Sequence, residues 1–202
     1  MNMIADNNEI EDVCVFAGSS LGNREIYSET AKKLAELLTK NQYGIVYGGG
    51  SNGLMGVLGD KTIEVGGYIT GIITEQLDEI EVGHKGLNEL IIVKNMHQRK
   101  KMMADKSQAV VCLPGGVGTW EEFFESLTWN QLGIQTKPII LLNIEDYYSK
   151  LSVFIKHAVA EGFLPESSSN ELIFVNNVED AILELKKFIP KDTSTWYQRL
   201  KD

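Results

Sequence analysis

Short apolar segments rich in β-branched residues alternate with longer amphipathic segments along nearly the whole chain. The short segments are apolar almost throughout, as expected of strands that are covered on both faces of a sheet. They lie at 13–17, 44–47, 68–73, 90–93, 109–113, 138–142 and 172–175. The segments between them predict helices near 24–40, 53–65, 95–106, 119–133, 146–161 and 178–188. This alternation predicts an α/β fold, a doubly wound parallel sheet with right-handed crossovers and helices on both faces.

The same pattern predicts a single domain over residues 12–188, with tails at 1–11 and 189–202. No repeat, low-complexity segment or linker rich in Pro or Gly divides the chain. The longest connection is 74–89, and long connections in such folds are usually functional. Ligands of open parallel sheets bind beyond the carboxyl ends of the strands, where the strand order reverses. The residues that follow the strands are therefore the candidates for a site.

Composition narrows the classes of protein. Of the 202 residues, 19 are Lys or Arg and 28 are Asp or Glu, which gives a net charge of −9. This balance argues against a nucleic-acid binder or an anionic-membrane binder, because both need a basic face. Cys14 and Cys112 lie in apolar runs and form neither a disulfide framework nor a zinc site, so we expect no metal. The N-terminal segment has acidic residues where a signal peptide would carry a basic region. The apolar runs are only about five residues long, too short to span a bilayer, so we expect a soluble cytoplasmic protein.

Three of the predicted strands end in glycine-rich turns, at 18–20, 48–53 and 114–119. Such a turn lets the backbone approach an anion closely, and the following helix offers free N–H groups and a partial positive charge. One such turn alone is explained equally well as a tight turn, but three at one edge of a sheet favour a phosphate ligand.

Two known phosphate-binding motifs help to decide which class of phosphate ligand the chain binds. The chain has no G-x-x-x-x-G-K-[ST] motif, which disfavours a P-loop NTPase. Residues 48–53 fit G-x-G-x-x-G, and Glu75 lies 22 residues beyond Gly53, so dinucleotide binding stays open as a minority alternative.

One stripe of the helix predicted near 95–106 carries Met96, Arg99, Lys100 and Met103. One interpretation is that the two long cationic side chains cover apolar surface while their charged ends reach water. The alternative is that Arg99 and Lys100 face an anion-binding cleft. His97 lies off this stripe, as does Lys101, and we expect both to be solvated.

Glu122 also has two interpretations. Thr119 and Glu122 form T-x-x-E, the sequence of a capping box at a helix start. The first turn of this helix should also point at the ligand, where a carboxylate is stabilised in its ionised form and can act as a base or stabilise developing positive charge.

Farther along the same predicted helix, Trp129 and Leu132 lie on a different face from the apolar residues Trp120, Phe123, Phe124 and Leu127. We expect this second face to bury against a partner subunit.

Four segments together resemble the LOG (Lonely Guy) family. They are FAGSS at 16–20, YGGGSNGLMG at 47–56, NMHQRKKMM at 95–103 and PGGVGTWEE at 114–122. The family comprises cytokinin riboside 5′-monophosphate phosphoribohydrolases, long labelled "possible lysine decarboxylases", and the resemblance covers about residues 12–188. It implies a Rossmann-like three-layer domain, a homodimer, no cofactor, and hydrolysis of adenine-type nucleoside 5′-monophosphates to free base and ribose 5-phosphate in cytokinin biosynthesis. No Lys lies in a recognisable pyridoxal-phosphate context, so lysine decarboxylation gains no support.

The resemblance also implies roles for individual residues. Arg99 and Glu122 match the family's catalytic pair, while Val117 stands where Tyr or Leu is common. The positions that match nucleotide-contacting residues are Ser20, Gly49, Gly50, Glu81, Met96, Lys100, Gly115, Gly116, Gly118, Thr119, Glu121 and Thr128. Two alternatives stay open, a non-catalytic nucleotide carrier or sensor and a dinucleotide-dependent oxidoreductase.

Overall fold

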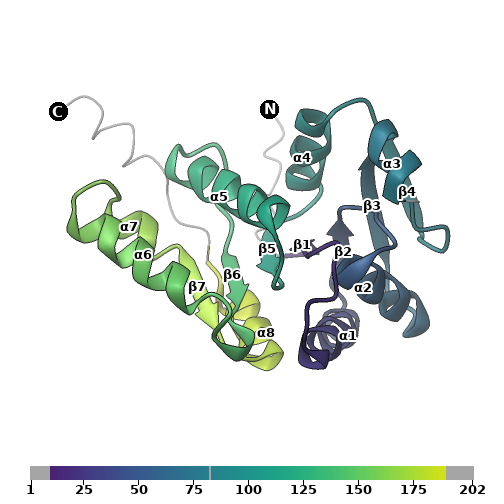
Figure 1. Ribbon diagram of the computed structural model, residues 1–202, viewed down its shortest axis with the longest axis horizontal. Coiled ribbons are helices and arrows are strands. Elements are labelled where there is room, and N and C mark those ends of the chain that lie inside the picture. The colour runs from purple at the N-terminus through teal and green to yellow at the C-terminus, as the bar shows by residue number, and fades with distance from the viewer. Residues whose placement is uncertain (1–9, 82, 190–202) are drawn as a thin grey trace, which may run out of the picture.

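The computed structural model describes residues 10–81 and 83–189, and over these the chain forms one seven-stranded sheet with parallel pairing throughout (Figure 1). The strands are β1 (Asp12–Phe16), β2 (Gly44–Tyr47), β3 (Ile69–Thr74), β4 (Glu89–Val93), β5 (Ala109–Cys112), β6 (Ile139–Leu142) and β7 (Leu172–Val175). Their order is β4-β3-β2-β1-β5-β6-β7. The chain builds outward from β1 to β4 and then returns to pair β5 with the other side of β1. The order therefore reverses between β1 and β5.

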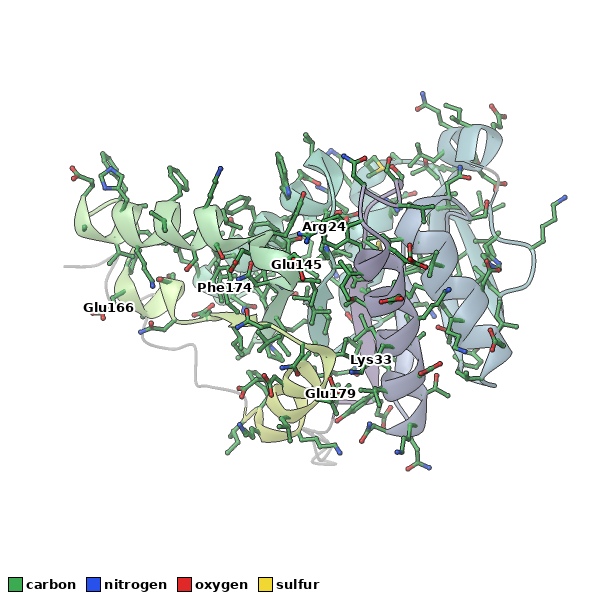
Figure 2. All side chains as sticks on the ribbon, turned by 60° about the horizontal axis from the view of Figure 1, so that its bottom comes forward. Arg24, Lys33, Glu145, Glu166, Phe174 and Glu179 are labelled. Atoms are coloured by element: carbon green, nitrogen blue, oxygen red, sulfur yellow. The ribbon has the colours of Figure 1, made fainter. Side chains whose placement is uncertain are left out.

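Helices cover both faces of this sheet. They are α1 (Glu25–Lys40), α2 (Gly53–Glu64), α3 (Glu75–Glu81), α4 (Met96–Asp105), α5 (Val117–Gln131), α6 (Ser149–Ala160), α7 (Glu166–Ser169) and α8 (Val178–Lys187), with a 3-10 turn η1 (Ile144–Asp146) before α6. One core cluster packs α1, α2 and α8 against the sheet, and a second packs α4, α5 and α6 against the opposite face. On the first face, Lys33 of α1 pairs with Glu179 of α8 at 2.5 Å (Figure 2). The structure therefore has three layers, as the alternation of segments predicts.

The structure confirms the predicted strands, each within one residue at either end. Two short helices, α3 and α7, were not predicted, and α3 occupies the first part of the connection 74–89. The helix predicted from 119 begins two residues earlier, at Val117. The one predicted over 146–161 corresponds to α6, which begins three residues later, at Ser149, after the turn η1. The predicted tails lie almost entirely outside the described residues. In the described part, no helix is both long and apolar enough to cross a bilayer.

Candidate active site

The loops that follow β1 and β5 touch through their backbones at the point where the strand order reverses. The Gly18 N–H donates to the Pro114 carbonyl at 3.3 Å. A Cβ on Gly18 would come within 3.2 Å of the Gly115 Cα, so a side chain at Gly18 would push the two loops apart. The residues after these two strands therefore form one continuous backbone surface at the carboxyl edge of the sheet.

The first backbone N–H groups of α2 are already used by the loop that follows β1. The Gly18 carbonyl accepts hydrogen bonds from the N–H groups of Leu54, at 2.9 Å, and Met55, at 3.4 Å. Gly53 has φ +61°, and a Cβ there would collide with the backbone of Ser19. Because a dinucleotide fold places its pyrophosphate on these first-turn N–H groups, their use by Gly18 argues against the dinucleotide alternative. The loop 48–53 packs against the loop that follows β1 instead.

The N-terminus of α5 is open. Gly116 is the N-cap, and a Cβ built on Gly116 or Gly118 would meet nothing within 4 Å. Gly115 differs, because a Cβ there would collide with Thr119 Oγ1. The first N–H groups of a helix have no partner within it, and here they adjoin open space. Residues 115–119 therefore form a cradle that can bind an anion through backbone N–H groups and the helix dipole.

The side chain of Arg99 lies beneath this edge, buried and held at three points. Its Nε donates to the Ile72 carbonyl at 2.9 Å, and Nη2 donates to the Gly48 carbonyl at 3.0 Å. Nη1 donates to Glu122 Oε1 at 3.3 Å. The interpretation of Arg99 as a solvated cation over apolar surface is therefore wrong, whereas His97 and Lys101 on the same helix are exposed as predicted.

The side chain of Glu122 is 10% exposed and faces Arg99. It does not occupy the capping-box position, because α5 begins at Val117 and Glu122 is the sixth residue of the helix. Burial raises the pKa of Glu122 to about 7, and the positive charge of Arg99 opposes this shift only in part. A carboxyl group that titrates near neutrality beside an anion cradle is typical of a catalytic group.

Lys100 bridges α4 and α5. Its Nζ bonds Glu121 and lies 3.0 Å from Glu125 Oε1. Arg99 and Lys100 thus each already pair with a carboxylate, so the affinity of the cradle for an anion rests mainly on backbone N–H groups rather than on a free cation.

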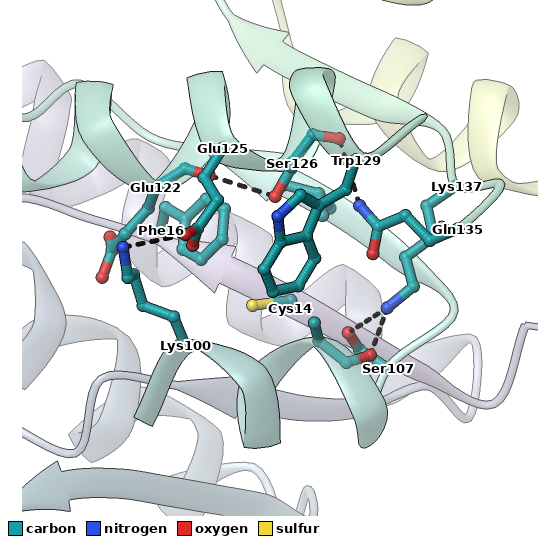
Figure 3. A pocket seen from close by; sticks show the side chains of 12 residues that line it. Cys14, Phe16, Lys100, Ser107, Glu122, Glu125, Ser126, Trp129, Gln135 and Lys137 are labelled. Carbon is teal, nitrogen blue, oxygen red and sulfur yellow. Dashed lines mark hydrogen bonds and ion pairs between the residues drawn. The ribbon is translucent and has the colours of Figure 1, made fainter. Parts of the chain in front are cut away.

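Behind Lys100 a cleft runs between α4 and α5, as Figure 3 shows. It is narrow, with a cavity volume of about 10 Å³, over a floor that includes Cys14 and Phe16. Trp129 lines one wall, and Lys137 lies at the far end, where its Nζ bonds the Ala104 carbonyl of α4. Burial lowers the pKa of Lys137. Lys137, which was not predicted, thus connects the end of the helix that carries Arg99 to the segment before β6.

The structure brings some of the other predicted contact residues to this edge. Met96 is exposed, with its Sδ 4.0 Å from Arg99 Nη1, and Ser20 is exposed in the loop after β1. Gly49 and Gly50 are buried, and their carbonyls accept hydrogen bonds from His84 N–H and Tyr47 Oη respectively. Contact of these residues with a nucleotide stays a prediction.

One predicted contact residue, Thr128, is not brought together with the cradle, and for another, Glu81, contact with a nucleotide stays a prediction. Thr128 lies on the exposed side of α5, roughly 10 Å along the helix from Glu121, and its hydroxyl donates to the Phe124 carbonyl. Glu81 ends α3, and its side chain lies outside the described residues. Over the described residues, no three His, Cys, Asp or Glu side chains gather as metal ligands. Both cysteines are buried free thiols.

The comparisons with known proteins place the chain in a family. Residues 55–185 match the family model described as "Possible lysine decarboxylase". The cytokinin riboside 5′-monophosphate phosphoribohydrolase LOG2 of Arabidopsis thaliana is 41% identical over 179 residues, which cover 89% of this chain and 84% of the relative. The enzyme of the same name from Rhodococcoides fascians is 41% identical over 177 residues, covering 87% and 89%. The chain belongs to the LOG family.

Solved structures show how widely the LOG fold is shared. The molybdenum cofactor carrier protein of Chlamydomonas reinhardtii superposes with a TM-score of 0.66 at 18% identity, over 87% of this chain and 96% of the carrier. The molybdenum cofactor binding protein of Rippkaea orientalis has a TM-score of 0.66 at 19% identity, over 87% and 94%. At such low identity these neighbours show the fold alone.

Proposed function

We propose that this protein hydrolyses the N-glycosidic bond of adenosine 5′-monophosphates, N6-modified ones included, and releases free base and ribose 5-phosphate. The observation that carries the proposal is the buried Arg99–Glu122 pair directly behind the open N-terminus of α5. LOG-family relatives about 40% identical over most of the chain bear the name of this activity.

The reaction requires stabilisation of positive charge on the sugar. Cleavage of a glycosidic C–N bond passes through an oxocarbenium-like state, and water then adds its hydroxyl to the anomeric carbon. The ionised Glu122 stabilises the growing charge and accepts a proton of the attacking water. The departing base nitrogen takes up a proton from solvent, so that the net reaction adds one water molecule. Arg99 keeps Glu122 in place and favours its ionised form, because a positive charge beside a carboxylate lowers its pKa.

The 5′-phosphate supplies the anchor. Held by the N–H groups of 115–119, it fixes the ribose so that the anomeric carbon lies against Glu122. Binding energy from this remote group is used to position the reacting centre, so a substrate without the phosphate should lose turnover as well as affinity.

We also propose that the protein works as a cytoplasmic homodimer. Three apolar side chains of the α5 segment, Trp120, Phe124 and Leu132, are 38–43% exposed in the single chain. Thr128 is exposed on the same helix, so a second copy seated there would cover it too. Trp129, predicted for this interface, lines the cleft between α4 and α5 instead. The two unpaired thiols, Cys14 and Cys112, fit a reducing compartment.

The direct test is to incubate the purified protein with AMP, N6-prenylated AMP and the two corresponding nucleosides, and to measure free base by chromatography. We expect base release from the monophosphates and far slower release from the nucleosides. A carrier or sensor would bind the monophosphates without releasing base. Equal rates on nucleoside and monophosphate would contradict the proposed anchoring role of the phosphate.

A further inference from the structure

Three successive carbonyls at the end of β5 accept hydrogen bonds from surrounding elements. Tyr148 Oη donates to the Leu113 carbonyl at 2.7 Å, and the Gly18 N–H donates to the Pro114 carbonyl at 3.3 Å. Tyr147 Oη donates to the Gly115 carbonyl at 2.5 Å. The peptide planes that lead into the cradle are therefore fixed one after another.

The hydrogen bond from Tyr147 to the Gly115 carbonyl fixes the direction of the Gly116 N–H. In a planar trans peptide, the carbonyl of one residue and the N–H of the following residue point in opposite directions. With its carbonyl held by Tyr147, Gly115 presents the Gly116 N–H on the side away from Tyr147. Gly116 is the N-cap of α5 and adjoins open space, so this N–H is one of the cradle's donors.

Tyr147 is itself held in place by the segment between β6 and α6. Its ring packs edge-on against Tyr27 of α1, with centroids 6.1 Å apart. The two residues before it, Glu145 and Asp146, have φ of 52° and 60°, a left-handed backbone that non-glycine residues adopt at an energetic cost. Glu145 is held by an ion pair of 2.6 Å with Arg24 (Figure 2). The strained turn thus presents Tyr147 to the cradle from a fixed position.

We propose that Tyr147 is a positioning residue for the phosphate site. It acts through the Gly115–Gly116 peptide, by directing one N–H donor toward the 5′-phosphate, and it does not touch the reacting atoms. The inference rests on the proposed function, because it assigns the phosphate of the substrate to the 115–119 cradle.

The test is Tyr147→Phe, which removes only the hydroxyl, with Tyr68→Phe as the control. Tyr68 is 56% exposed and directly precedes β3, at the amino edge of the sheet. We expect Tyr147→Phe to raise the KM for AMP and the inhibition constant of ribose 5-phosphate about tenfold, by roughly the same factor. Hydrolysis of adenosine, which lacks the phosphate, should stay at the wild-type rate. Tyr68→Phe should leave all three values unchanged.

Several results would overturn the inference. Equal losses on AMP and adenosine would indicate a general structural role, and unchanged constants for AMP and ribose 5-phosphate would show that the hydroxyl does not orient the donor. A wild-type protein that cleaves neither substrate would refute the proposed function. Calorimetric binding of ribose 5-phosphate to the wild type and Tyr147→Phe would still decide the role of Tyr147, since equal affinities would refute it and a tenfold loss would support it.

Discussion

Arg99 Nη1 lies 3.3 Å from Glu122 Oε1, and both residues are more than nine-tenths buried. The two residues come from different helices, α4 and α5, and are 23 positions apart in the chain. Burying a carboxylate is costly unless it is paired, and Arg99 is itself held by the backbone carbonyls that accept from its Nε and Nη2. The pair is thus a single unit whose protonation state governs the site.

Activity should depend on the ionisation of Glu122. Because the pKa of Glu122 is raised to about 7, we expect kcat/KM for AMP to fall about tenfold per pH unit well below pH 7. Glu122→Gln should lower kcat by roughly 10²–10⁴-fold while the nucleotide still binds. The measurement is a pH profile of both proteins. An acid limb of the same midpoint in Glu122→Gln would assign this titration to another group.

The same pKa makes a prediction for stability. The folded pKa of about 7 lies above the ordinary value of 4.5, so between these values the native state holds a proton that the unfolded chain has released. The contribution of Glu122 to the free energy of unfolding therefore falls by about 3 kcal/mol as the pH rises from 4.5 to 7. Glu122→Gln does not titrate, so its Tm relative to the wild type should be higher at pH 8 than at pH 5. A relative Tm that does not change between these two values would contradict the raised pKa.

Loss of Arg99 should damage both activity and stability. Arg99→Ala leaves Glu122 buried without its partner, which we expect to cost about 3–5 kcal/mol of unfolding free energy and most of kcat. His97→Ala is the matched control on the same helix, because His97 is exposed, and its effect should be mild. Steady-state kinetics and thermal melts of the two variants test this prediction. Near-normal turnover in Arg99→Ala would refute the catalytic assignment.

The open cradle predicts a variant that folds well and binds poorly. Gly118→Ala places a methyl group in open space on the first turn of α5, where alanine favours the helix by about 1 kcal/mol. We expect an unchanged or higher Tm and a KM for AMP raised about tenfold or more, because the methyl group takes the space of the phosphate. Gly115→Ala should instead lower the Tm, since its Cβ collides with Thr119. A Gly118→Ala protein with unchanged KM would place the phosphate elsewhere.

The proposed dimer predicts that charged substitutions at two exposed leucines have different effects on assembly. Leu132 follows α5 and is 38% exposed, whereas Leu183 of α8 is 50% exposed on the opposite face of the sheet. Leu132→Glu should shift the protein toward monomer, and Leu183→Glu should not. Sedimentation velocity at micromolar concentration distinguishes the outcomes. A wild-type monomer would contradict the dimer, and a dimer that persists in Leu132→Glu would exclude this face.

The strands could be predicted from the sequence because they are continuous apolar runs. A strand that helices cover on both faces of the sheet has to be apolar throughout. The segments 44–47 and 172–175 coincide with β2 and β7 at both ends. Helix α3 was missed because Glu75–Glu81 is short and largely acidic, with too few apolar residues for a helical period. Its packing depends on contacts with β3 and β4 that lie outside its own sequence.

The site was predictable only in part. Spacing placed Arg99 on an inward stripe, but its three acceptors belong to separate elements, which no local pattern indicates. The start of α5 was misplaced because its N-cap is Gly116, which has no side chain to cap the helix. Tyr147 gave no signal at all, since a hydroxyl bond to a backbone carbonyl 32 residues away follows from the tertiary arrangement alone.

The closure of α2 by the Gly18 carbonyl limits how many phosphoryl groups the site can hold. Of the N-termini of α2 and α5, that of α5 adjoins open space, whereas the first N–H groups of α2 donate to the Gly18 carbonyl. A nucleoside di- or triphosphate that extended toward α2 would bring its negative oxygens against a carbonyl oxygen instead of N–H donors. Selection for a monophosphate would then come from the main chain rather than from the chemistry of any one side chain.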